Sequence, residues 1–177
     1  MLMNDTVRLK EEVRRLVAEL RNRGVPEKEI LALFLKKQKL SRLLITNDYK
    51  IKLIDYNCGT DIDLPPLPRA IYLLYLHHPE GIAFKDLPDY TDELREIYWS
   101  MKLRTEAPKK VEKSIIDVTN PLEHSIIEKC SKIRQSFLKV VPKLVAKHYI
   151  ITGGRAETKR ILLDRKLVIW EKESPPL

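Results

Sequence analysis

Polar side chains of types that bind nucleic acids recur along one amphipathic segment, residues 121–141. At about 100° per residue, a narrow apolar arc predicts the core side of a helix there. The members of this arc are Ile126, Cys130, Ile133, Phe137 and Val140. The candidate contact residues away from it are Ser125, Glu128, Lys129, Ser131, Lys132, Gln135 and Lys139. Lysine and glutamine bond purine edges, glutamate accepts from cytosine, and serine or lysine binds phosphate oxygens.

A basic β-hairpin is predicted directly after this helix. Residues 149–152 and 159–163 are predicted strands joined by a turn of sequence Gly-Gly-Arg-Ala-Glu. Arg155 lies at the tip, and Lys159 and Arg160 lie on the returning strand. Residues 129–166 hold 11 Lys or Arg and 2 Asp or Glu, a net charge of +9 in 38 positions. Such a block is typical of polyanion binding, and the alternative is a solvated lysine-rich surface.

Motifs of enzyme active sites do not occur in the sequence. Gly153-Gly154 predicts a turn, and no dinucleotide-binding, phosphate-loop or nucleophile-elbow motif is found. Adjacent His77 and His78 point about 100° apart on a helix, which favours interaction with the helix C-terminus over a metal pair. Cys58 and Cys130 have no metal-ligand spacing. We therefore expect no catalytic residue, metal or cofactor.

Composition is that of an ordinary globular protein. The 177 residues are 44% apolar and 33% charged, with a net charge of +8, and no run of 18 apolar residues occurs. The early charged residues and the absence of a signal-peptide core predict a cytoplasmic protein that does not enter a membrane.

Three regions are predicted. Residues 1–40 indicate two short helices that pack on the rest of the chain or form a homodimer, because neither is stable alone. Residues 41–171 form the main domain, and residues 172–177 are a tail.

The main domain is predicted to be mainly α with small β-sheets. Three short strands over 43–64 form an N-terminal antiparallel sheet, and helices follow over 70–78 and 89–101. Residues 102–119 are polar and basic, and one helical turn is predicted from Val111 to Ile116. Asn120, Pro121 and Glu123 predict the N-cap, first position and capping-box glutamate of the third helix. A short helix then precedes the hairpin, and 167–170 is a last strand.

This element order resembles the DNA-binding domain of OmpR/PhoB-type response regulators. The matching segments are Ile62-Asp63-Leu64-Pro65, Ile71 to Gly81, Phe84-Lys85-Asp86-Leu87, Ser125 to Arg134 and Tyr149 to Arg155. The resemblance covers about 130 residues and implies a winged helix-turn-helix with a three-helix core and a hairpin wing. It implies a transcription regulator that binds double-stranded DNA, with the third helix in the major groove and RNA polymerase as a possible partner.

The sequence departs from that family in several places. Pro68, Arg69 and Ala70 stand where the family has an early acidic residue, and the segment before the third helix is longer. The wing glycines precede Arg155, and residues 1–40 contain no receiver domain.

Two other functions stay open. Winged-helix domains also dock proteins. A docking surface is expected to have exposed aliphatic or aromatic residues, and the outer face of the third helix is predicted to lack them. RNA binding is the third possibility, although stacked-aromatic motifs are absent.

Overall fold

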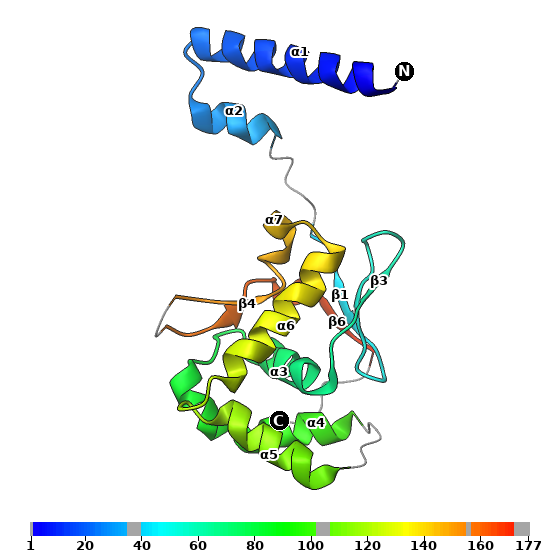
Figure 1. Ribbon diagram of the computed structural model, residues 1–177, viewed down its shortest axis with the longest axis vertical. Coiled ribbons are helices and arrows are strands. Elements are labelled where there is room, and N and C mark those ends of the chain that lie inside the picture. The colour runs from blue at the N-terminus through cyan, green and yellow to red at the C-terminus, as the bar shows by residue number, and fades with distance from the viewer. Residues whose placement is uncertain (1, 35–39, 102–106, 155–156, 172–177) are drawn as a thin grey trace. The chain divides into compact units, whose positions relative to one another are not determined.

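The computed structural model describes residues 2–34, 40–101, 107–154 and 157–171. Its contacts divide the chain into two compact units, residues 1–39 and residues 40–177. The described part is mainly helical with small sheets (Figure 1), which confirms that part of the predicted fold class. No described helix is both long enough and apolar enough to span a membrane.

The first unit contains α1 (Leu2–Asn22) and α2 (Glu27–Phe34). A turn at Gly24 joins them, with φ of +75°, a value that glycine adopts without steric cost. Arg21 forms an ion pair with Glu27 across this turn. The predicted pair of helices is therefore present.

A four-stranded sheet opens the second unit. Strands β1 (Leu43–Ile45), β2 (Ile51–Leu53) and β3 (Thr60–Ile62) pair antiparallel in sequence, as predicted. The last strand, β6 (Val168–Trp170), joins the other side of β1 in parallel, with Leu43 opposite Val168. The sequence did not predict this pairing, which joins segments more than 120 residues apart.

Helix α3 (Pro66–His77) lies at the centre of the unit. It begins at proline, which suits a first turn because that turn has no partner for its N–H groups. Residues 70–76 are buried on every side. An all-apolar helix of this kind is expected inside a core rather than on a surface. The sheet, α4 and α6 supply that surrounding core.

Two α-helices lie between α3 and residue 125, where the sequence predicted one. A 3₁₀ segment, η1 (Phe84–Tyr90), leads into α4 (Thr91–Ser100), and α5 (Pro108–Thr119) is a full helix. The prediction of a largely irregular 102–119 segment was therefore wrong for residues 108–119. Val111, Ile115 and Val118 repeat at helical spacing, and the polar residues before and between them obscured this pattern. Residues 102–106 lie outside the described part.

Polar contacts hold α5 against α4. Glu112 accepts hydrogen bonds of 3.0 Å from both Arg95 Nε and Trp99 Nε1. Thr91 Oγ1 donates to Thr119 Oγ1 over 2.9 Å. These contacts fix α5 beside the helical core.

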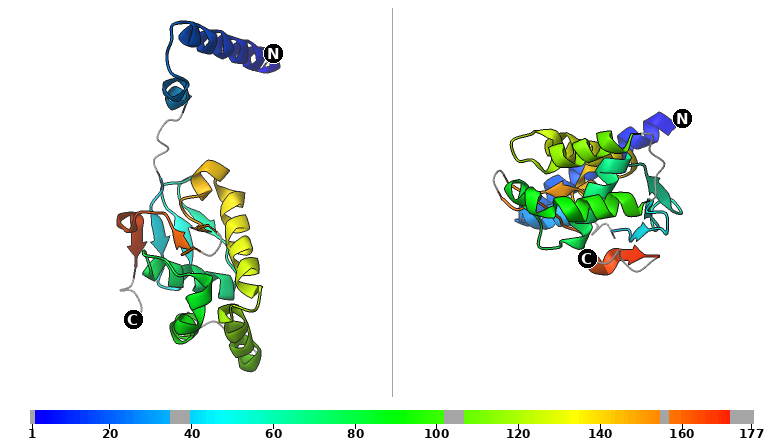
Figure 2. Two further views of the ribbon diagram at one scale, coloured as in Figure 1. Left: turned by 90° about the vertical axis from the view of Figure 1, so that its left-hand side faces the viewer. Right: turned by 90° about the horizontal axis from the view of Figure 1, so that it is seen from below.

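The chain then runs through α6 (Ser125–Val140), α7 (Lys143–Ala146), β4 (Ile151–Thr152), β5 (Arg160–Ile161) and η2 (Arg165–Leu167). Strands β4 and β5 form a separate two-stranded hairpin. In the left view of Figure 2, α6 and β6 lie on opposite sides of this unit.

Candidate nucleic-acid interface

Helix α6 begins four residues later than predicted. The Asn120 side chain accepts from Leu122 N–H over 3.0 Å, and Asn120 itself ends α5. Residues 121–124 form a turn, so the predicted N-cap at Asn120 and capping box with Glu123 were wrong. Residues of these types can start a helix, but in this structure they form the connection between α5 and α6.

The core side of α6 is the predicted one. Ile126, Ile133 and Phe137 are buried. The Phe137 ring lies 5.3 Å from the ring of Tyr72 and stacks on that of Tyr149 at 5.8 Å between centroids. These contacts fix the rotation of α6 and therefore decide which of its residues face outward.

The outward face of α6 is bordered on both sides. On one side, Lys129 and Lys132 line a groove with the proline-rich start of α3 and with Val111 and Ser114 of α5. On the other side, α6 packs against β4 of the hairpin. Cys130 lies on this side, and burial raises the pKa of its thiol to about 12. The face of α6 between these borders is open. Its exposed residues are Ile127, Glu128, Ser131, Lys132, Arg134, Gln135, Leu138 and Lys139.

Of the residues predicted as contacts on α6, five lie on the open face: Glu128, Ser131, Lys132, Gln135 and Lys139. Ser125 and Lys129 are half-buried at its margin, and the Lys129 side chain is 18% exposed. Arg134 is exposed on this face and was not predicted, although its helical position beside Ser131 would have identified it.

Glu128 neutralises part of the positive charge. Its carboxylate lies 2.7 Å from Lys132 Nζ and 3.1 Å from Lys129 Nζ. Hydrogen bonds from Lys132 and then Lys129 lower the pKa of Glu128. A ligand phosphate that binds either lysine must therefore compete with this carboxylate.

The open face also contains aliphatic residues. Ile127 is 55% exposed and Leu138 is 37% exposed. The expectation that this face lacks exposed aliphatics was therefore wrong. The prediction placed only a narrow apolar arc in the core. Ile127 and Leu138 lie outside that arc, and their exposure was not considered.

The hairpin is anchored to the connection between α3 and η1. Ile82 and Lys159 exchange backbone hydrogen bonds of 2.9 and 3.0 Å. Gly81 has φ of +87°, and a Cβ there would meet the Lys159 carbonyl oxygen at 2.4 Å. Only glycine fits this close approach.

The three basic hairpin residues have different environments. Lys159 Nζ donates to the carbonyl oxygens of Gly153 and Gly154 and lies 5.5 Å from the centroid of the Phe84 ring. Arg160 is exposed on β5. Arg155 lies outside the described residues.

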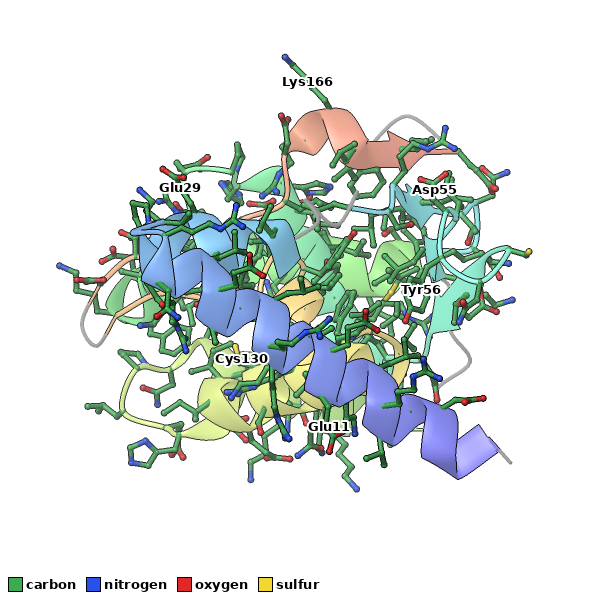
Figure 3. All side chains as sticks on the ribbon, turned by 90° about the horizontal axis from the view of Figure 1, so that it is seen from above. Glu11, Glu29, Asp55, Tyr56, Cys130 and Lys166 are labelled. Carbon is green, nitrogen blue, oxygen red and sulfur yellow. The ribbon has the colours of Figure 1, made fainter. Side chains whose placement is uncertain are left out.

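Several basic side chains around α6 are available for an anion. Among the described residues, no ion pair involves the following five: Arg134, Lys139, Lys143, Lys147 and Arg160. Lys166 also forms no ion pair with a described residue. Lys166 projects from η2 on the opposite side of this unit from α6 (Figure 3), so it does not extend the same surface.

The adjacent histidines meet carboxylates. His78 contacts Glu80 through Nδ1 at 2.7 Å and Glu93 through Nε2 at 2.9 Å. The His77 side chain is 6% exposed, and its Nδ1 lies 3.5 Å from Glu93. The described residues contain no group of three or more His, Cys, Asp or Glu arranged to hold a metal ion.

Arg165 occupies the helix end that the histidines were predicted to satisfy. Its guanidinium donates to the carbonyl oxygens of Tyr75 and Leu76, each over 3.0 Å. It donates further to Leu163 O over 2.9 Å. Burial lowers the pKa of Arg165. A basic residue from outside the helix thus binds the last carbonyls of α3.

Comparison with protein-family models, curated proteins and solved structures gives no match. The function must therefore be inferred from the interface itself.

Proposed function

We propose that residues 40–171 bind double-stranded DNA in the manner of a winged helix-turn-helix transcription regulator. The observation that carries this proposal is the open face of α6, where Arg134 and Lys139 stand without ion pairs beside Ser131 and Gln135. In this proposal α6 enters the major groove, and Arg160 on the hairpin contacts the phosphate backbone.

The element arrangement supports the winged-helix interpretation. Helices α3, α4 and α6 serve as the three core helices, and β4–β5 serves as the wing. The Ile82–Lys159 bridge joins the wing to the connection after α3. Helix α5 is an addition between the second and third core helices, and it occupies the segment whose extra length departs from the OmpR/PhoB-type pattern.

Charge supports a polyanionic ligand. The basic residues without ion pairs on α6, α7 and β5 can neutralise phosphates and release their counterions. The ion pairs of Glu128 restrict Lys129 and Lys132 but leave Arg134, Lys139 and Arg160 unaffected.

The test is a fluorescence-anisotropy titration of the full chain with random duplex DNA at several salt concentrations. We expect affinity to fall steeply between about 50 and 200 mM salt, by about 0.9 log units per log unit of salt for each phosphate contact. A flat response, or no binding at low salt, would overturn the proposal. Duplex RNA added as a competitor distinguishes the two nucleic acids. Preferential binding of RNA would identify RNA as the ligand of the same surface.

A second candidate function is protein docking by the same face. The exposed Ile127 and Leu138 favour it, because an apolar contact on a helix face is typical of protein partners. In a DNA complex these side chains would instead contact thymine methyl groups. Replacing both with serine separates the two functions. DNA binding through lysine and arginine should largely persist, whereas docking should be lost.

A further inference from the structure

Helix α1 has a stripe of exposed apolar side chains. Leu9 is 62% exposed, Leu16 is 49% exposed and Val13 is 43% exposed. Thr6, Leu9, Lys10, Val13 and Arg14 border a shallow groove along the same stripe. Val17 and Leu20, farther along α1, are half-buried. The part of α1 before Val17 thus presents an apolar surface to solvent.

The stripe follows a heptad repeat. Thr6, Val13 and Leu20 are seven residues apart and occupy a positions, and Leu9 and Leu16 occupy d positions. A β-branched residue at a and leucine at d favour two-stranded parallel coiled coils. Leu9 and Val13 can therefore act as knobs that insert between the side chains of a facing helix.

Charges flank the stripe unequally. Asp5, Glu12 and Glu19 occupy the three successive g positions, whereas Lys10 occupies an e position. In a parallel pair, each g residue faces the e residue of the next heptad on the partner helix, so Asp5 faces Lys10. An antiparallel pair would place the acidic g rows against each other, which is unfavourable. The charge pattern is therefore complementary to a second copy in the parallel orientation.

We propose that α1 pairs with α1 of a second copy of this chain in a parallel, two-stranded coiled coil. The stripe supplies the buried seam, and the Asp5–Lys10 pairs select the orientation. Dimerisation would cover Leu9, Val13 and Leu16, which α2 leaves exposed within the first unit. The inference concerns self-association and does not depend on the proposed DNA binding.

The first test measures the mass of the full chain by sedimentation equilibrium over a range of concentrations. We expect a reversible dimer. Leu9→Glu should weaken dimerisation at least about tenfold, because it would bury a carboxylate in the seam. Ala18→Glu adds the same charge at an outward f position of α1 and should leave the dimer intact. A monomer at every concentration, or a dimer equally tolerant of both substitutions, would overturn the proposal. If the stripe instead packs on residues 40–171 of its own chain, Leu9→Glu will lower the stability of a monomer.

The second test determines orientation by disulfide cross-linking. Thr6→Cys, in a Cys58→Ser background, should cross-link two chains under mild oxidation because a positions face each other in a parallel pair. Cys130 can stay, because burial raises its thiol pKa to about 12. Glu11→Cys, at an outward f position, is the control. Failure of Thr6→Cys to cross-link within a proven dimer would exclude the parallel orientation.

Discussion

The hydroxyl of Tyr149 donates a 2.8 Å hydrogen bond to the carbonyl oxygen of Ser41, 108 positions earlier in the chain. Tyr149 precedes the hairpin and Ser41 precedes β1, and both are buried. Burial raises the pKa of Tyr149 to about 12, so the phenol stays a hydrogen-bond donor. The Ser41 hydroxyl also accepts from Asp55 N–H over 2.9 Å. One polar link therefore connects the N-terminal sheet to the segment that carries the candidate interface.

Tyr149→Phe should lower the free energy of unfolding by about 1–2 kcal/mol, because a buried carbonyl oxygen loses its donor while the ring packing remains. Chemical denaturation measures the change. Tyr56→Phe is the control, since Tyr56 is only half-buried and its hydroxyl makes no hydrogen bond to a described residue. Equal stability of the two variants would show that the Tyr149–Ser41 bond contributes nothing.

Arg165→Met should lower the free energy of unfolding by about 2–3 kcal/mol, because carbonyl oxygens at the end of α3 lose a charged donor. Lys166→Met removes the same charge from the next residue, which projects into solvent, and should change stability by less than about 0.5 kcal/mol. Thermal and denaturant unfolding of both variants check this difference. Similar losses in both would mean that charge, rather than the bonds to Tyr75 and Leu76, matters.

Gly81→Ala should destabilise the chain more than Gly59→Ala. Both glycines have positive φ, and a Cβ at Gly59 would meet no atom within 4 Å. Gly59→Ala therefore reports the backbone penalty alone, about 1–2 kcal/mol. Gly81→Ala adds the clash with Lys159 and should loosen the Ile82–Lys159 bridge. Amide hydrogen exchange of Ile82 and Lys159 measures this loosening. Exchange should be faster in Gly81→Ala and unchanged in Gly59→Ala.

His78 should stabilise the fold more in acid than in base. Burial acts to lower its pKa, but hydrogen bonds with Glu93 and Glu80 outweigh burial and the net shift is upward. A raised folded-state pKa gives stability that is fully present below the unfolded pKa, about 6.5, and is lost as pH rises through the folded pKa. His78→Gln should therefore cost more stability at a pH of about 5.5 than at about 8.5.

His77 provides the opposite control. Burial lowers its pKa, so its neutral form favours folding and stability is lost as pH falls through the unfolded pKa. His77→Gln should reduce that acid sensitivity. Denaturation curves give the free energy of unfolding of both variants across this pH range. If the loss of stability changed with pH in the same direction for both variants, the opposite pKa shifts of His77 and His78 would be contradicted.

The proposed DNA interface is predicted to contain base-reading and phosphate-binding residues. Lys132→Ala or Gln135→Ala should cost about 1–3 kcal/mol on a preferred site and relax sequence preference. Lys139→Ala or Arg160→Ala should weaken binding to all sequences and reduce the salt slope by about 0.9 each. For Arg155 and Lys159 the same even loss is predicted.

Lys166→Ala is the matched control for these substitutions, because it removes one positive charge on the opposite side of the unit. It should leave affinity and salt slope almost unchanged. If it weakens DNA binding as much as Arg160→Ala does, the interaction depends on net charge rather than on the α6 surface. If Lys132→Ala and Gln135→Ala leave sequence preference unchanged in a folded protein, α6 is not the recognition helix.

Local sequence patterns were enough to predict the mainly helical class, the first three strands, the hairpin and the core side of α6. These features follow from local periodicity, since apolar residues spaced for a helix or a strand must be buried on one face. Ile126, Ile133 and Phe137 were predicted correctly for that reason.

Which elements pair with one another depends on contacts between distant parts of the chain. The parallel pairing of β6 with β1 depends on contacts between distant segments, and no local pattern specifies it. Asn120 and Pro121 could start a helix or connect two, and burial of Ile115 and Val118 in α5 favoured the second. Arg165 rather than His77 or His78 reached the carbonyls of α3, because folding placed its long side chain at that helix end. The exposed positions of Arg134 and Ile127 likewise followed from how α6 packs between the hairpin and α5.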